Sequence, residues 1–311
     1  MRAISLISVC IAAIVTSTSC KKEPTPVSEE LSVLGYSNLR WEGGDNHYWS
    51  VYTINSDGTS DQKLVSSDMQ LCGTEWSPDG TKILVCGMAT PTLASPRLLY
   101  VMNADGTNLQ NLTQLTDAVS PRWSRDGLKI TFTKCYPEQN NRSEIWMMNA
   151  DGSEQISIVE GHGSSFFANG TKLIYISAKT GNSEIYTCDI DGTNQLKITS
   201  TAESEYNMDV SPDGTMVIYT LIANSTDINT WEIYCMNMDG TNVTRLTNNS
   251  YLDEQARWSP DGNRIAFISS RGNSSQRSEV YIMNADGTGA KKVTNANSRS
   301  NSANLPSWKP K

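Results

Sequence analysis

A phrase built around Asp-Gly recurs along the chain and limits the possible folds more than any other feature. Asn stands two residues before the Asp in five of the copies, a pattern that fits a tight β-hairpin turn with Gly in the left-handed position. Each copy follows an alternating apolar run such as 280–284. The six copies, separated by 48, 46, 40, 48 and 47 residues, are Asp57-Gly58-Thr59, Asp105-Gly106-Thr107, Asp151-Gly152-Ser153, Asp191-Gly192-Thr193, Asp239-Gly240-Thr241 and Asp286-Gly287-Thr288.

A second phrase alternates with the first. Ser-Pro-Asp-Gly fits a type I turn, with Pro at the second position and Gly at the fourth, and a strand-like run follows each copy. Each repeat of about 47 residues is therefore predicted to have four strands. One strand lies before and one after the Ser-Pro-Asp-Gly turn, and one lies before and one after the Asp-Gly-Thr turn. The copies are Trp76–Gly80, Trp123–Gly127, Val210–Gly214 and Trp258–Gly262, with Phe166–Gly170 as a degenerate fifth.

Four-stranded units at this period are typical of β-propeller blades. The 281 residues from 31 to 311 have room for six of them. The first unit lacks a Trp-Ser-Pro-Asp-Gly phrase, and the C-terminal segment Leu305–Lys311 supplies the missing Trp308. We predict an all-β, six-bladed propeller of four-stranded antiparallel blades. The C-terminal strand completes the first blade and so removes an open sheet edge.

The two phrases together resemble the TolB-like six-bladed propeller, a repeat family related to WD repeats. The resemblance covers residues 31–311, and the separate α/β N-terminal domain of TolB has no counterpart in it. It implies the fold but says little about activity, because the repeated residues build turns and cores. TolB binds Tol and Pal proteins, but the repeated residues alone do not predict such binding for this chain.

The N-terminal segment has the features of a targeting signal. Arg2 precedes an apolar run over 3–15, too short to span a membrane, and small residues lead to Cys20. This arrangement resembles a bacterial lipobox, with Ser17 where Leu is commonest. We predict a lipoprotein signal peptide over 1–19, acylation of Cys20, a polar tether over 20–30 and the propeller over 31–311. The protein would be lipid-anchored in a Gram-negative cell envelope, periplasmic or outer-membrane. The alternative is an ordinary signal peptide with an incidental cysteine.

Composition excludes several classes of function. With 25 Lys and Arg against 33 Asp and Glu, the chain has no basic excess for nucleic acid. Its two histidines, His47 and His162, are too few for a three-histidine zinc site or the multi-histidine metal centre of oligogalacturonate lyases. The cysteines after Cys20 form no metal or redox motif. Cys72 and Cys86 flank one predicted hairpin, and whether they form a disulfide stays open.

Catalytic and cofactor motifs are sparse. Asp189–Gly192 resembles the start of a calcium loop but lacks the later ligands, including a Glu at position 12. We interpret it as a turn and expect no cofactor, with Ca²⁺ as the lesser alternative. The chain has no Gly-x-Ser-x-Gly elbow. His162 lies near Ser164 in sequence, but a catalytic triad also needs an acidic partner that the sequence does not identify.

The tryptophans divide into two groups. Trp76, Trp123, Trp258 and Trp308 share one repeat position and are expected between blades. Trp146 falls where other blades have Tyr, so it is also expected to be structural. Trp41 and Trp49 lie outside the repeated positions, and they are either further core or exposed ligand platforms.

Binding sites usually occupy varied loops on a rigid scaffold. The Asp-Gly turns share one face of such a propeller, and the varied loops share the other. We predict that acidic residues of the inter-blade loops gather at the channel mouth there and bind a cation, a basic protein or a polyol, unless they are merely solvated charges. These residues are Asp68, Asp117, Glu160, Glu203, Glu205, Asp253 and Glu254.

The resulting hypothesis is a monomeric, lipid-anchored envelope protein that binds a protein or glycan on the varied face without catalysis. The alternative is a lyase or glycan hydrolase, because two carboxylates about 5–10 Å apart suffice for glycosidic chemistry.

Overall fold

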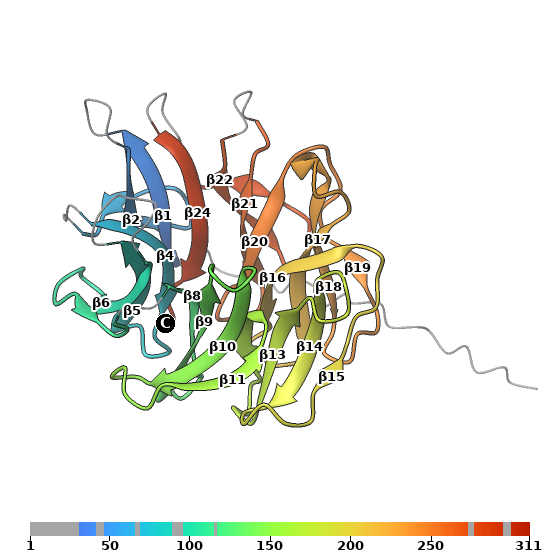
Figure 1. The fold of residues 1–311 in the computed structure, drawn as a ribbon. Coiled ribbons are helices and arrows are strands. Elements are labelled where there is room, and N and C mark those ends of the chain that lie inside the picture. The colour runs from blue at the N-terminus through green and yellow to red at the C-terminus, as the bar shows by residue number, and fades with distance from the viewer. Residues whose placement is uncertain are drawn as a thin grey trace, which may run out of the picture.

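The computed structural model describes residues 31–41, 47–65, 69–88, 96–114, 117–272, 277–294 and 300–311. These residues form six four-stranded sheets arranged in a ring, and each sheet is one blade (Figure 1). The helical element in the described residues is the short 3-10 helix η1, Ile228–Thr230. Among these residues, no helix combines the length and the apolarity needed to cross a membrane. The predicted six-bladed, all-β propeller is confirmed.

Every blade runs outward from an inner strand at the channel. Neighbouring strands within a blade are antiparallel, so sequence order and spatial order agree in blades 2 to 6. Blades 1 to 3 consist of β24 (Ser300–Trp308), β1 (Val33–Trp41), β2 (His47–Asn55) and β3 (Gln62–Lys63); β4 (Gln70–Trp76), β5 (Lys82–Met88), β6 (Leu98–Asn103) and β7 (Gln110–Asn111); β8 (Asp117–Trp123), β9 (Lys129–Tyr136), β10 (Arg142–Asn149) and β11 (Ile156–Glu160). Blades 4 to 6 consist of β12 (His162–Phe166), β13 (Lys172–Ser177), β14 (Glu184–Asp189) and β15 (Leu196–Lys197); β16 (Ser204–Val210), β17 (Met216–Ile222), β18 (Trp231–Asn237) and β19 (Thr244–Arg245); β20 (Asp253–Trp258), β21 (Arg264–Ser269), β22 (Glu279–Asn284) and β23 (Lys291–Lys292).

The ring closes as the sequence predicts. The last strand, β24, lies beside the first, β1, and pairs with it antiparallel (Figure 1). In this register, Trp308 is paired with Leu34. Trp308 is buried, and its indole Nε1 donates to the carbonyl of Arg257 in blade 6 at 3.1 Å. On the other side, Ser307 Oγ donates to Thr74 Oγ1 of blade 2 at 2.8 Å. Blade 1 therefore joins both ends of the chain and binds both neighbouring blades.

The Asp-Gly-Thr turns satisfy their own polar groups. In blade 2, Asp105 Oδ1 accepts from Thr107 N at 3.0 Å and from Thr107 Oγ1 at 2.6 Å. Gly106 has a φ of 83°, and a Cβ there would lie 2.2 Å from the carbonyl oxygen of Leu64 in blade 1. Glycine is required both by the left-handed backbone and by this close approach. The Asp is therefore used inside its turn, and the alternative of Ca²⁺ at these phrases stays a prediction.

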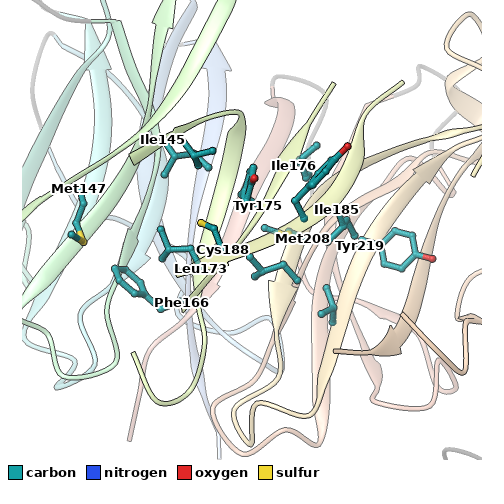
Figure 2. Close-up of a cluster of buried hydrophobic side chains, with 14 of the residues drawn as sticks. Ile145, Met147, Phe166, Leu173, Tyr175, Ile176, Ile185, Cys188, Met208 and Tyr219 are labelled. Atoms are coloured by element: carbon teal, nitrogen blue, oxygen red, sulfur yellow. The ribbon is translucent and has the colours of Figure 1, made fainter. Parts of the chain in front are cut away.

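The core runs continuously from blade to blade. Figure 2 shows one stretch of it, in which Ile145 of blade 3, Tyr175 of blade 4 and Tyr219 of blade 5 belong to one buried cluster. Alternation along the middle strands supplies these side chains, because every second residue points to the same face of a sheet. Burying them stabilises each blade only together with its neighbours.

The repeated tryptophans pack between blades, as predicted. Trp76, Trp258 and Trp308 are 6%, 8% and 5% exposed, and Trp123 is half-buried against the core of blades 2 and 3. Trp146 packs beside Phe132 with ring centroids 6.5 Å apart, which confirms its structural role.

Cys72 and Cys86 are direct cross-strand partners in β4 and β5. Both are free thiols in this structure, as are the three other described cysteines. The side chain of Cys86 is buried and lines the central channel.

Candidate ligand-binding face

The antiparallel blades give the ring two unlike faces. We call the side with the Ser-Pro-Asp-Gly and Asp-Gly-Thr turns the turn face. The opposite side, which we call the loop face, has the connections between blades and between the second and third strands of each blade. Those connections differ: β9 and β10 are joined by 137–141, whereas β17 and β18 are joined by 223–230 with helix η1. The loop face is the varied one, as the sequence predicts.

Every inner strand has a β-bulge beside the channel. The register of each inner strand shifts at one residue whose φ is positive, between 44° and 71°. Such a backbone is strained for most residues, so its repetition in all six blades indicates a shared structural requirement. These residues are Gly73, Ser120, Gly163, Asn207, Gln255 and Leu305.

Sequence reasoning missed this ring of bulges. Only two of the six residues are glycine, so composition does not mark the position. The available signal is the spacing, because each residue stands three positions before the last residue of its inner strand.

Side chains close most of the channel. The cavity that remains has a volume of about 40 Å³ and is lined by residues from all six blades. Glu75 and Arg122 meet there in an ion pair with 2.8 Å between Oε2 and Nη1. A water needs about 10–15 Å³ of such space, so the cavity holds only a few small molecules. It is not a deep pocket of the kind that encloses a substrate.

Two of the predicted acidic residues are tied to arginines. Asp117 accepts from Arg97 Nε at 2.7 Å and Nη2 at 2.8 Å. Burial pushes the pKa of Asp117 upward, but these hydrogen bonds and the positive charge hold it below its ordinary value. Asp253 is fully buried and accepts from Arg271 Nη2 at 2.5 Å and Asn249 Nδ2 at 2.6 Å. Both carboxylates are parts of the scaffold.

Two others lie at the blade connections. Glu160 is 63% exposed and stands 3.6 Å from Arg142 Nε. Glu203 is half-buried, and its backbone carbonyl accepts from the Asn182 side chain. Asp68 lies outside the described residues. The structure therefore does not gather the predicted acidic residues into one exposed group.

Glu205 is fully buried, although the sequence suggests a surface position. Its Oε2 accepts from Thr199 Oγ1 at 3.1 Å, and its Oε1 accepts from Thr201 Oγ1 at 2.9 Å. Burial raises the pKa of Glu205 to about 7, and the negative charge of Glu184 adds to the effect. No ligand reaches this carboxylate without opening the blade.

Glu254 is the predicted residue best placed for binding. It lies at the channel mouth on the loop face, half-buried, where Asn207 Nδ2 approaches its Oε2 at 3.5 Å. Burial raises the pKa of Glu254 to about 7. Burial of Tyr206 raises the pKa of this tyrosine, and the negative charge of Glu254 adds to the effect.

Aromatic rings pack against Tyr206, which directly precedes Asn207 in β16. Tyr206 is 39% exposed, its ring centroid 6.1 Å from that of His162 and 6.4 Å from that of Trp231. We call His162, Tyr206, Trp231 and Glu254 the mouth cluster. It draws on blades 4, 5 and 6, whose inner strands converge on the channel.

The sequence singles out Glu254 as a ligand-binding candidate and His162 as a possible catalytic residue, but not Tyr206 or Trp231 as ligand-binding residues. Tyr206 follows Glu205 at the start of an inner strand, and this place in the repeat could have indicated a residue near the channel mouth. Of the two tryptophans considered as ligand platforms, Trp49 is half-buried, and the side chain of Trp41 lies outside what the structure describes. Within the described residues, no three His, Cys, Asp or Glu side chains form a group able to hold a metal ion.

Comparison with known proteins agrees with the fold. A family model described as the TolB beta propeller domain matches residues 39–228, well over half of the chain. This chain belongs to the TolB β-propeller family. A TolB homologue from Chlorobium luteolum is 28% identical over 170 residues, which cover 53% of this chain and 37% of the homologue. A Tol-Pal system protein TolB from Anaeromyxobacter dehalogenans is 31% identical over 105 residues, 34% of this chain and 23% of the relative.

Among solved structures, the crystal structure of TolB from Acinetobacter baumannii matches 90% of this chain and 67% of its own length. The TM-score is 0.75 at 20% sequence identity, so this likeness concerns the fold. The aligned region spans less than two fifths of either of the two curated relatives. Family membership therefore establishes the propeller for this chain, whereas its ligand has to be inferred from its own surface.

Proposed function

We propose that the protein is a lipid-anchored component of a Gram-negative cell envelope that binds a protein partner through the mouth cluster. The observation that carries the proposal is the contrast between the two faces. On the turn face, the repeated polar side chains are used within their own turns. On the loop face, Tyr206 exposes an aromatic ring beside Glu254, a carboxylate with a distant hydrogen-bond donor. Exposed aromatic residues next to a desolvated charge are typical of binding hot spots.

Family membership supports an envelope role. One matching relative is named a Tol-Pal system protein. The proposed signal peptide over 1–19 and acylated Cys20 agree with such a location, and the tether over 20–30 would hold the propeller away from the membrane. The carboxylate of Glu254 and the exposed ring of Tyr206 suit a partner that presents a basic side chain, through charge and cation–π attraction.

The alternative of a glycan hydrolase or lyase receives less support from the site. Burial raises the pKa of three described carboxylates, Glu75, Glu205 and Glu254, and the pKa values of Glu205 and Glu254 reach about 7. Glu205 is fully buried and occupied by Thr199 and Thr201. A pair of accessible carboxylates about 5–10 Å apart is what glycosidic chemistry requires.

The binding proposal is tested with the variants Tyr206→Ala and Glu254→Lys. The wild-type protein is used to capture envelope proteins, and the enriched partner is purified and titrated against each variant. We expect each substitution to weaken binding about tenfold or more, because truncating a hot-spot aromatic typically costs at least about 1–2 kcal/mol. The effect of Glu254→Lys should shrink as salt rises, since exposed charges are then screened.

A matched control comes from the other face. Leu128 is 65% exposed on the turn face, and Leu128→Ala removes an apolar side chain without touching the mouth cluster. It should leave the affinity unchanged. If Leu128→Ala abolishes capture while the Tyr206 and Glu254 variants keep full affinity, the proposal has chosen the wrong face.

Lipid anchoring is tested separately with Cys20→Ala. We expect the variant to move from the membrane fraction to the soluble envelope fraction while the propeller keeps its melting temperature. Mass spectrometry of the mature wild-type N-terminus should show an acylated cysteine. Unchanged fractionation together with an unmodified N-terminus would exclude the anchor but leave the binding proposal standing.

A further inference from the structure

The central channel contains a buried cation without a direct ionic partner. Arg257 lies in β20 one residue before Trp258 and is 8% exposed. Its Nη1 donates to the carbonyls of Ala256 at 3.2 Å and Met208 at 3.5 Å. Its Nε is buried and has no hydrogen-bond partner among the described residues. None of the ion pairs within the described part of the chain includes Arg257.

Burying the Arg257 guanidinium without an ion-pair partner destabilises the folded state. The two carbonyls replace part of the hydration that the buried guanidinium loses, but the unpaired buried Nε–H of Arg257 keeps its desolvation penalty. Burial and the nearby positive charge of Arg122 lower the pKa of Arg257 to about 10, although the negative charges of Asp209 and Glu75 act in the opposite direction. A negatively charged ligand at this position would relieve both costs.

The nearby protein carboxylates have other partners. Glu75 Oε2 accepts from Arg122 Nη1 at 2.8 Å. Asp209 Oδ2 accepts from the backbone N–H of Trp258 at 2.9 Å. Neither lies within 4.0 Å of the Arg257 guanidinium in an ion pair, so the edge of Arg257 formed by Nε and Nη2 remains available.

A space for a ligand adjoins this residue. Arg257 lines the channel cavity of about 40 Å³, and Ser164 lines it from blade 4. Ser164 is 3% exposed, and its Oγ is a second buried polar atom without a hydrogen-bond partner among the described residues. The cavity therefore combines a cation and a hydroxyl, both able to donate, with room for a ligand of a few non-hydrogen atoms.

We propose that this cavity binds a small carboxylate, held by the Nε–Nη2 edge of Arg257 and by the hydroxyl of Ser164. A carboxylate has two oxygens that match the guanidinium fork, whereas a spherical anion uses the fork less well and water carries no charge. The cavity volume limits the ligand to the size of formate or acetate. Because the cavity is lined by all six inner strands, a bound carboxylate would stabilise the closed ring.

The inference concerns the interior of the ring and does not depend on binding at the loop face. Its test uses formate as the probe. The purified protein is melted at constant ionic strength while sodium formate replaces sodium chloride. We expect the melting temperature to rise and then saturate, since a ligand that binds only the folded state stabilises it in proportion to its occupancy.

Variants separate the site from a general salt effect. Arg257→Met should weaken the apparent affinity for formate at least about tenfold, and Ser164→Ala should weaken it severalfold with the charges intact. Arg125→Met removes an exposed guanidinium on the turn face and should leave the affinity at the wild-type value. If Arg257→Met does not fold, Ser164→Ala still reports on the site.

A crystal soaked in formate gives the direct readout. The proposal expects planar density bridging Arg257 Nε and Nη2. It is overturned by density that only water explains, by a melting temperature that stays flat as formate replaces chloride, or by equal formate affinity in the wild-type protein and both cavity variants.

Discussion

Deleting Leu305–Lys311 should open the ring and cost more stability than any single core truncation. The segment contains the buried residues Pro306, Ser307 and Trp308, and it pairs with Leu34 and Gly35 of β1. Its loss leaves blade 1 with an exposed edge, which favours intermolecular pairing. Trp258→Ala, a single truncation between blades, should cost about 3–5 kcal/mol. The deletion should exceed that figure and promote aggregation.

The measurement is thermal melting combined with size-exclusion chromatography. At about 2–4 °C per kcal/mol for domains of this size, the deletion should lower the melting temperature by more than about 10 °C. Removing the exposed Lys311 alone is the control and should lower the melting temperature far less than the seven-residue deletion. A melting temperature within a few degrees of wild type would show that β24 does not hold the ring closed.

The repeat made the architecture predictable because turn chemistry and blade geometry are local. Gly106 is an example. Both its left-handed φ and the nearby carbonyl of Leu64 require a residue without Cβ, so the geometry of the turn appears in the sequence as a repeated glycine. Closure was predictable for a similar reason, since Trp308 stands at a repeat position whose blade starts at the other end of the chain.

The site was less predictable because it depends on which side chains converge across blades. Asp117, Glu205 and Asp253 are acidic residues at the starts of inner strands. Nothing in the sequence indicates that their respective hydrogen-bond partners are Arg97, Thr199 and Arg271. Pairing and burial then decide the role of each carboxylate.

The same limit applies to the channel. Arg257 stands one residue before the last residue of its inner strand. The other five blades have Glu75, Arg122, Ser165, Asp209 and Ser307 at this position. The residue type at this position is acidic, basic or neutral in different blades, so the sequence shows no repeated pattern there. In the structure, Glu75, Arg122 and Arg257 at this position line the channel cavity, so residues of unlike charge from three blades share one buried space.

The stability of the protein should fall as the pH rises from about 4.5 to about 7, and Glu205 should be a main cause. Its pKa lies at about 7 in the folded protein against an ordinary value of 4.5, because burial and the charge of Glu184 oppose ionisation. The folded state therefore holds its proton longer than the unfolded state, and each pH step between the two values favours unfolding. The difference of about 2.5 pKa units corresponds to about 3 kcal/mol, lost by pH 7 to 8.

Glu205→Gln isolates this contribution, since the amide cannot ionise. Its oxygen accepts from one of the hydroxyls of Thr199 and Thr201, and its NH2 group donates to the other. We expect the variant to unfold at a higher denaturant concentration than wild type at pH 8, by about 1–3 kcal/mol, with the advantage disappearing near pH 4.5. Glu254 shifts in the same direction and should leave a residual slope in the variant. Glu160→Gln removes a negative charge from an exposed site and serves as the control, retaining the wild-type slope. If Glu205→Gln runs parallel to wild type from pH 4.5 to 8, the buried carboxylate is already ionised at low pH, and the threonine hydrogen bonds outweigh its burial.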